Sequence, residues 1–263
     1  MNNLVDPKIA DWLNEKADFY NNPSFVESDP ISISHMFSKK EDIEIAALFS
    51  AIIAWGNRKA IIAGAQQLMQ RMDNAPFQFI TGHSHKDLKK LNGFVYRTFN
   101  SFDAITLCEG LKNVYLHEGG LQRAFSEPLL KDKNTNAFNA IENFRKVVLH
   151  YPHEKRFEKH ISSPERGSAA KRLNMFLRWM VRRDQCGVDF GLWTDTFSMS
   201  RLLIPLDVHS ARIAREIGLL SRKQTDAKAV LEVTENCRLL DPDDPARFDF
   251  ALFGTGINEK HYF

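Results

Sequence analysis

Apolar residues recur at helical spacing along most of this chain. The stretch from Glu41 to Trp55 is the strongest case, because isoleucine, leucine, phenylalanine and alanine return there every three or four positions. The alternation of apolar and polar residues that would indicate strands is weak throughout. Phenylalanine is frequent, with 20 residues. We therefore predict an all-α fold in which helices pack around a phenylalanine-rich core.

Helix start and stop signals divide the chain further. Asp6-Pro7 joins an N-cap to a proline in the first turn and predicts a helix that runs to Tyr20. Asp29-Pro30 opens a short second element. Gly56-Asn57 ends the apolar helix, and Asn57 can cap a helix that continues to Met72. Further helices are predicted over 103–117, 136–150, 168–183, 207–220, 225–240 and 244–253.

Length and composition bound the class of protein. With 263 residues and a net charge of +2, the chain is long enough for a sizeable core and is not globally basic. We expect one helical domain over residues 1–263, which two helical subdomains with a cleft between them could also form. The segment Glu127–Thr135 is the most linker-like. Three scattered cysteines exclude a cysteine-based zinc knuckle or a four-cysteine iron–sulfur cluster within this chain. No secretory signal or membrane-length apolar run is visible, so we expect a cytoplasmic protein with no membrane partner.

Positive charge is concentrated between Glu165 and Arg183, a segment with six Lys or Arg residues and one acidic residue. Lys171 follows the small residues of Gly167–Ala170 and opens an amphipathic basic helix. Such a turn allows a phosphate to approach the backbone N–H groups at a helix start. A neutral lysine amine can attack a sugar C1′ and form a Schiff base. The alternative is an ordinary solvated lysine on a basic helix face.

Asp207 is the second candidate catalytic residue. It follows Ile204-Pro205-Leu206 and precedes a helical pattern, which makes it an N-cap. A carboxylate fixed at a helix start could stabilise an oxocarbenium-like sugar or activate a nucleophile. The alternative is a purely structural cap.

Other side chains add weaker candidates. Trp193 and Phe197 lie between the two motifs and could clamp an extruded base, unless they simply pack in the core. Trp55 is a third candidate for such a base pocket. Asp207 and His209 form only an Asp-x-His pair, and adding His35, His83 and His85 assembles no convincing ligand set. We therefore expect no metal and no cofactor.

The chain resembles a bacterial family of uncharacterised conserved proteins. The resemblance covers most of the sequence and lies in five strings: Ala51–Lys59, Asn174–Met180, Ile204–His209, Ser221–Asp226 and Phe248–Gly256.

More distantly, the chain is similar to the helix-hairpin-helix DNA glycosylase superfamily, especially its archaeal 8-oxoguanine glycosylase branch. In that superfamily a lysine follows the hairpin and an aspartate follows later, and Lys171 and Asp207 match these positions. The apolar helix from Leu48 to Trp55 resembles the superfamily's opening helix. The hairpin segment Pro164–Ser168 keeps one glycine where the superfamily has two. The spacing from Lys171 to Asp207 is also longer than in most members.

The resemblance implies a helix-hairpin-helix glycosylase-like fold. It also implies a DNA glycosylase with AP-lyase activity that removes an oxidised purine such as 8-oxoguanine. Lys171 would be the nucleophile and Asp207 would stabilise the charged sugar. The partner would be duplex DNA with a damaged base, or single-stranded DNA. The residues expected at nucleic acid are Arg166, Gly167, Ser168, Arg172, Arg178 and Arg182.

Two alternatives stay open. One is a catalytically silent nucleic-acid-binding protein of the same fold, which the single-glycine hairpin favours. The other is a metal-dependent small-molecule hydrolase that uses Asp207 and His209. The sequence does not fix the lesion, the choice between DNA and RNA, or the oligomeric state.

Overall fold

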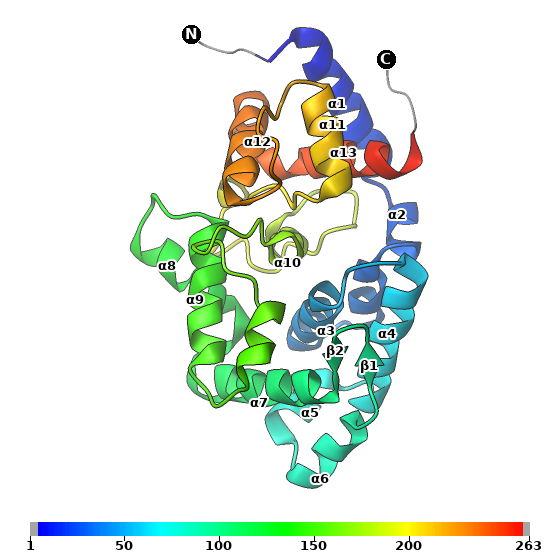
Figure 1. The fold of residues 1–263 in the computed structure, drawn as a ribbon, viewed down its shortest axis with the longest axis vertical. Coiled ribbons are helices and arrows are strands. Elements are labelled where there is room, and N and C mark those ends of the chain that lie inside the picture. Colours follow the sequence, from blue (N-terminus) through cyan, green and yellow to red (C-terminus); the bar gives the residue numbers. More distant parts are fainter. Residues whose placement is uncertain (1–4, 260–263) are drawn as a thin grey trace. The chain divides into compact units, whose positions relative to one another are not determined.

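A computed structural model describes residues 5–259. This part of the chain is built almost wholly of helices, with one short hairpin of two strands (Figure 1). The chain divides into two compact units. Unit 1 takes in residues 1–25, 134–138 and 163–263, and unit 2 takes in residues 26–133 and 139–162. The all-α prediction is confirmed.

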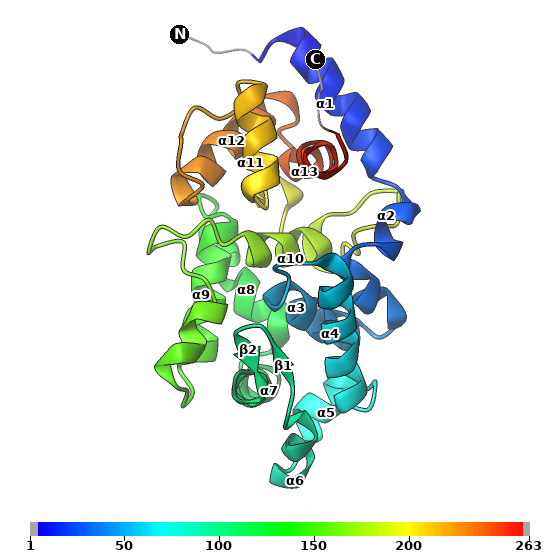
Figure 2. The ribbon, with the colours of Figure 1, turned by 45° about the vertical axis from the view of Figure 1, so that its right-hand side comes forward.

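Unit 1 is organised around the helix α13 (Phe248–Asn258), which packs against α1 (Pro7–Tyr20) and α11 (Val208–Glu216). Figure 2 shows α13 end-on with α1 and α11 beside it. Two glycines of α13 permit this close packing. A Cβ at Gly254 would lie 2.3 Å from the Tyr20 ring, and one at Gly256 would lie 3.0 Å from the His209 carbonyl oxygen. The other elements of unit 1 are the start of α2 (Pro23–Glu27), α10 (Lys171–Val181), η4 (Met199–Arg201), α12 (Ala227–Leu240) and η5 (Pro245–Arg247).

Unit 2 has α3 (Lys40–Ile52) at its centre. The residues of α3 from Ile43 to Ile52 are all buried, and the helix packs against η1 (Pro30–Met36), α4 (Arg58–Arg71) and α5 (Pro76–Gly82). Figure 1 shows the hairpin, β1 (Val95–Tyr96) and β2 (Phe99–Asn100), beside α4. The remaining elements are α6 (His85–Leu88), η2 (Lys89–Leu91), α7 (Ser101–His117), α8 (Gly120–Lys131), most of α9 (Ala137–Leu149) and η3 (Lys155–His160).

The predicted helix starts are confirmed where a side chain caps the helix. The side chains of Asp6, Asp29, Asn57 and Asp207 each accept a hydrogen bond from a backbone N–H in the following turn. The helix predicted over 168–183 begins only at Lys171, because Gly167 and Ala170 have left-handed backbones with φ of 87° and 45°. The helix predicted over 244–253 is the short η5 followed by α13, which continues to Asn258.

The linker prediction for Glu127–Thr135 is wrong over its first half, because α8 continues to Lys131 with Pro128 inside it. A proline in a helix leaves the carbonyl four residues earlier without its usual donor. Here the Asn143 side chain donates to that carbonyl, Ala124 O, at 2.8 Å. The boundary between the two units follows at residues 133 and 134, inside the predicted segment. None of the helices within residues 5–259 combines the length and apolar character that spanning a membrane requires.

Candidate active site

Lys171 and Asp207 lie together in unit 1. The Lys171 Nζ is 3.8 Å from the Asp207 Oδ2, and both side chains are about one-fifth exposed, at 23% and 21%. Lys171 is the first residue of α10 and Asp207 is the N-cap of α11. The second carboxylate oxygen, Oδ1, accepts the backbone N–H groups of His209 and Ser210 at 2.9 and 3.0 Å. The cap therefore fixes the carboxylate and leaves its other oxygen on the side of the lysine.

The turn before α10 sets the position of Lys171. The Gly167 N–H donates to Pro164 O at 2.8 Å, and the Ser168 Oγ accepts the Ala170 N–H at 3.1 Å. The Asn174 side chain donates back to Ala169 O at 3.0 Å. Gly167 and Ser168 thus shape the backbone here, and their contact with a phosphate stays a prediction.

Two further side chains surround the lysine amine. The Lys171 Nζ lies 5.3 Å from the centre of the Phe253 ring and 3.4 Å from the Met175 Sδ. Phe253 belongs to α13 and is half-buried. Sequence reasoning missed Phe253. In the sequence, the only indication is that Phe253 follows Asp249 by four positions, which places the two side chains on the same face of a helix.

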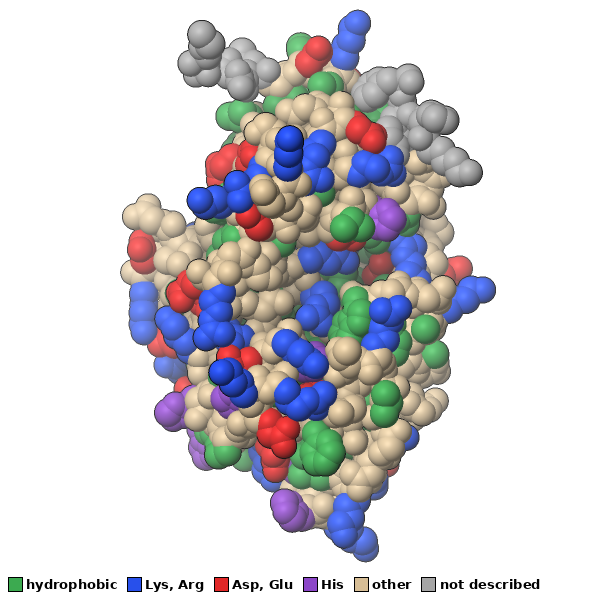
Figure 3. Space-filling model, in the orientation of Figure 1, with side chains coloured by type: hydrophobic (Ala, Val, Ile, Leu, Met, Phe, Trp, Pro, Cys, Tyr) green, Lys and Arg blue, Asp and Glu red, His purple; other side chains and the backbone are tan. Residues whose placement is uncertain are grey.

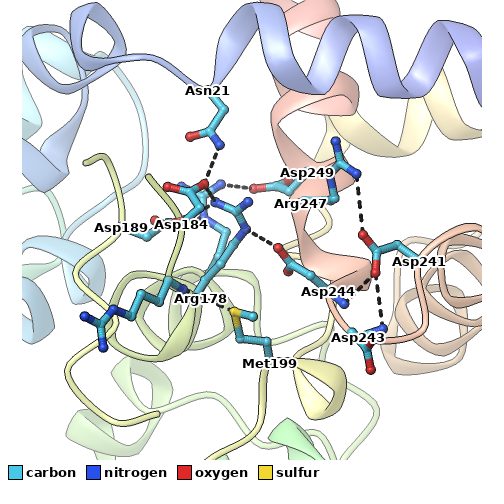
Figure 4. A network of polar contacts seen from close by, with 12 residues as sticks. Asn21, Arg178, Asp184, Asp189, Met199, Asp241, Asp243, Asp244, Arg247 and Asp249 are labelled. Carbon is cyan, nitrogen blue, oxygen red and sulfur yellow. Dashed lines mark hydrogen bonds and ion pairs between the residues drawn. The ribbon is translucent and has the colours of Figure 1, made fainter. Parts of the chain in front are cut away.

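Deeper along α10, arginines and aspartates form a buried ionic network (Figure 4). The Arg178 Nη1 lies 2.6 Å from the Asp249 Oδ2, and its Nε lies 3.3 Å from the Asp189 Oδ1. The Arg178 guanidinium also lies 4.2 Å from the centre of the Phe250 ring. Every residue of α10 from Leu173 to Val181 is buried, so an arginine there needs carboxylate partners.

Arg182 continues the network. Its guanidinium contacts Asp184, Asp189 and Asp244 at 2.6, 3.3 and 2.8 Å. The Asn21 amide donates to the Asp184 Oδ2 at 2.6 Å. Since Arg178 and Arg182 are 2% and 3% exposed, the prediction that they contact DNA phosphates is wrong. Arg166 is exposed and Arg172 is half-buried, so only these two of the four arginines have any surface for such contacts.

The network connects electrostatically to the Lys171–Asp207 pair through Asp249. Burial raises the pKa of Asp249 to about 6, the positive charges of Arg178 and Lys171 oppose that rise, and the negative charge of Asp207 adds to it. Burial likewise raises the pKa of Asp189 and of Asp244. Burial lowers the pKa of Arg172 to about 10, so its guanidinium stays charged at neutral pH.

The predicted base-pocket aromatics fall into two groups. Trp193 and Phe197 are 0% and 1% exposed, and Trp193 packs edge-to-face on Phe176 with ring centres 5.4 Å apart. Both are core residues of unit 1 and offer no open ring face, so the clamp prediction is wrong for them. Trp55 belongs to unit 2 and is half-buried, so its role in a base pocket stays a prediction.

Among the residues that the structure describes, the histidines assemble no metal-ligand set. His209 is exposed near α13. His83 and His85 line a pocket of about 480 Å³ in unit 2, together with Glu109 and Lys112. Burial lowers the pKa of His83, and the charge of Lys112 adds to this effect. Within residues 5–259, no group of three or more His, Cys, Asp or Glu side chains could hold a metal ion.

Comparison with known proteins places the chain in a family. A family model described as "Protein of unknown function (DUF2400)" matches residues 29–258. No curated protein and no solved structure matches the chain. Because the family model spans most of the sequence, the chain belongs to the DUF2400 family.

Proposed function

We propose that the protein is a DNA glycosylase with AP-lyase activity, in which Lys171 is the nucleophile and Asp207 its carboxylate partner. One observation carries the proposal. The lysine and the aspartate that resemble the catalytic pair of the helix-hairpin-helix glycosylases come from separate helix starts, and Nζ and Oδ2 are 3.8 Å apart. A purely structural cap would not require a lysine at this distance.

The chemistry follows from this pair. The Lys171 Nζ must lose a proton before it attacks, and the Asp207 Oδ2 is positioned to accept it through a small movement or one bridging water. The Nζ–C1′ bond then forms as the N-glycosidic bond breaks. The leaving base takes the electron pair of that bond and the proton that Asp207 had accepted, which returns Asp207 to its ionised form. The ionised Asp207 stabilises the positive charge that develops on the sugar.

The lyase step uses the same covalent intermediate. The nitrogen lone pair opens the sugar ring to form a protonated Schiff base, and O4′ takes the C1′–O4′ electron pair and a proton. Loss of a proton from C2′ then expels the 3′ phosphate with the electron pair of its C–O bond. Lys171 is regenerated when water hydrolyses the Schiff base.

The substrate assignment rests on the resemblance. A damaged purine such as 8-oxoguanine would be removed after extrusion from the helix. Arg166 and the turn through Gly167 and Ser168 would contact the phosphates beside the extruded nucleotide. The half-buried Arg172 would add positive charge near them. Phe253, half-buried beside Nζ, supplies an apolar wall that limits hydration of the amine.

Borohydride trapping tests the proposal. Borohydride reduces a protein–DNA Schiff base to a stable amine, so a covalent adduct reports the intermediate. The wild-type protein is incubated with duplex and single-stranded oligonucleotides that carry 8-oxoguanine, uracil, hypoxanthine or an abasic site. We expect an adduct that is absent with Lys171→Gln and retained with Lys228→Gln, a matched change of an exposed lysine on α12.

Asp207→Asn separates the two roles of the carboxylate. Asparagine also caps helices well, so the variant should fold with a near-normal Tm. We expect its adduct to form about 100-fold or more slowly, because the sugar charge loses its counterion. An adduct that forms at the wild-type rate in Lys171→Gln would refute the proposal.

One observation favours a second candidate, a nucleic-acid-binding protein without catalysis. The turn Pro164–Gly167 keeps a single glycine, which leaves fewer positions where a backbone can approach a phosphate closely. This candidate predicts salt-sensitive DNA binding and no adduct on any substrate. The hydrolase alternative has no ligand set within residues 5–259.

A further inference from the structure

The hairpin of unit 2 has an unusual residue at its tip. Val95 pairs with Asn100 and Tyr96 pairs with Phe99, which leaves Arg97 and Thr98 as a two-residue loop. Arg97 adopts a left-handed backbone with φ of 54°. Loops of this length usually place glycine, asparagine or aspartate at such a position. The chain therefore holds an arginine where glycine would be less strained.

The Arg97 side chain is held against a second special residue. A Cβ at Gly56 would lie 2.9 Å from the Cζ, Nε and Nη2 atoms of Arg97, so the guanidinium lies close to the space that a side chain at position 56 would occupy. Gly56 itself has φ of +100°. Only glycine allows both this backbone and this contact. One strained backbone, at Arg97, and one glycine, Gly56, thus position one exposed cation.

More positive charge surrounds this point. Lys59 is exposed in the first turn of α4, three residues after Gly56. Arg156 donates to Thr98 O at 3.3 Å, and Asp103 balances its charge at 3.0 Å. No salt bridge joins Arg97 or Lys59 to a carboxylate in the part of the chain that the structure describes. Figure 3 shows Lys and Arg side chains gathered over the hairpin and the start of α4.

An aromatic ring stands beside these cations. Trp55 directly precedes Gly56, and its half-buried ring is supported from two sides. The Tyr96 ring meets it edge-on with centres 5.6 Å apart, and the His160 ring stacks with it at 6.2 Å. The Tyr96 hydroxyl also donates to Trp55 O at 2.8 Å. The packing fixes the ring in place in a residue that is half-buried as a whole.

We infer that Trp55, Lys59 and Arg97 form a binding surface for an unpaired strand of nucleic acid. The inference rests on the proposed function only in taking nucleic acid as the partner. A fixed aromatic face that stacks on a base, next to uncompensated cations that contact the adjoining phosphates, is the combination that single strands require. Duplex DNA offers phosphates but no exposed base face, so it should bind this surface less tightly.

Arg97→Gly is the decisive variant, because glycine favours the left-handed backbone and the folded hairpin should keep or raise its Tm. Fluorescence anisotropy of a labelled oligothymidylate reports binding by the full chain. We expect about tenfold weaker binding at low salt, and a plot of log Kd against log salt that is shallower by about 0.7 for the lost phosphate contact. Lys86→Gln, an exposed cation of α6, is the charge-matched control and should bind like the wild type.

Arg97→Lys keeps the charge and loses the planar group, so it should bind with intermediate affinity. Unchanged affinity and an unchanged salt slope in Arg97→Gly would overturn the inference, as would a preference for duplex over single strand that Arg97→Gly leaves intact. Trapping at saturating protein separates this result from the proposed chemistry. Lys171→Gln should bind the oligonucleotide normally and form no adduct, whereas Arg97→Gly should bind weakly and still form it.

Discussion

Two groups of cations in this protein illustrate opposite uses of the same residue type. In unit 1, Arg178 and Arg182 are buried and every guanidinium contacts carboxylates. In unit 2, Arg97 and Lys59 are exposed and have no salt bridge within residues 5–259. The first group neutralises buried acids, and the second leaves its charge available for a ligand. A count of basic residues along the sequence does not separate these two uses.

The largest expected effect is that of replacing Lys171, the partly exposed first residue of α10. Lys171 shares the helix with Arg178 but is about one-fifth exposed, and its carboxylate partner is equally exposed. We expect Lys171→Gln to abolish borohydride trapping and to leave the free energy of unfolding nearly unchanged, since exposed ion pairs contribute little to stability. A stable variant with full trapping would show that Lys171 is only a surface cation.

Removing a buried cation should have the opposite result. Arg178→Met removes the arginine that lies 2.6 Å from Asp249. It also removes one of the positive charges next to Asp189. We expect a loss of about 3–5 kcal/mol in the free energy of unfolding, measured by urea denaturation. Arg97→Gly is the comparison variant and should lose none. Equal losses in the two variants would refute the distinction between the groups.

Asp249 gives the network a pH dependence. Its pKa is raised to about 6 by burial, so the folded state holds its proton more tightly than the unfolded state does. The stabilising contribution of the protonated form is fully present below about pH 4 and is lost as pH rises through 6. The stability of the wild type relative to Asp249→Asn should therefore fall by up to about 3 kcal/mol between these limits. A difference that does not vary with pH would show that Asp249 stays ionised throughout.

Arg166 should give the smallest effect. It is exposed on the turn before α10 and is part of the proposed phosphate contact. We expect Arg166→Gln to change the free energy of unfolding by no more than about 0.5 kcal/mol. Its DNA affinity should fall a few-fold with a shallower salt dependence. Binding measured at two salt concentrations provides the check, and an unchanged slope would exclude Arg166 from the interface.

The elements of the fold could be predicted where their signals are local. Asp6, Asn57 and Asp207 cap helices through residues two or three positions away, so the sequence alone contains both partners. The burial of Arg178 could not be predicted, because Asp249 lies on α13, seventy-one positions further along the chain. The hairpin was missed because strands of two residues have no visible alternation.

The candidate site was predictable in part for the same reason. Lys171 and Asp207 were identified from their neighbours and from a resemblance, whereas their separation of 3.8 Å depends on how α10 and α11 pack. Phe253 and Asp249 had no local signal that related them to the lysine. Trp193 and Phe197 show the limit of choosing an aromatic residue by its place between two motifs, since both are buried in the core.

The packing of α1 on α13 has a consequence for how the chain is made. Unit 1 contains both the first and the last helices. Gly254 of α13 has no side chain, which leaves room for the Tyr20 ring of α1. During synthesis, unit 2 is complete once residue 162 has emerged from the ribosome, so it can fold while translation continues. Because α13 is synthesised last, α1 has no helix to pack against until nearly the whole chain has been made. A ribosome that stalls after unit 2 would therefore hold one folded unit and an exposed amphipathic helix in need of a chaperone.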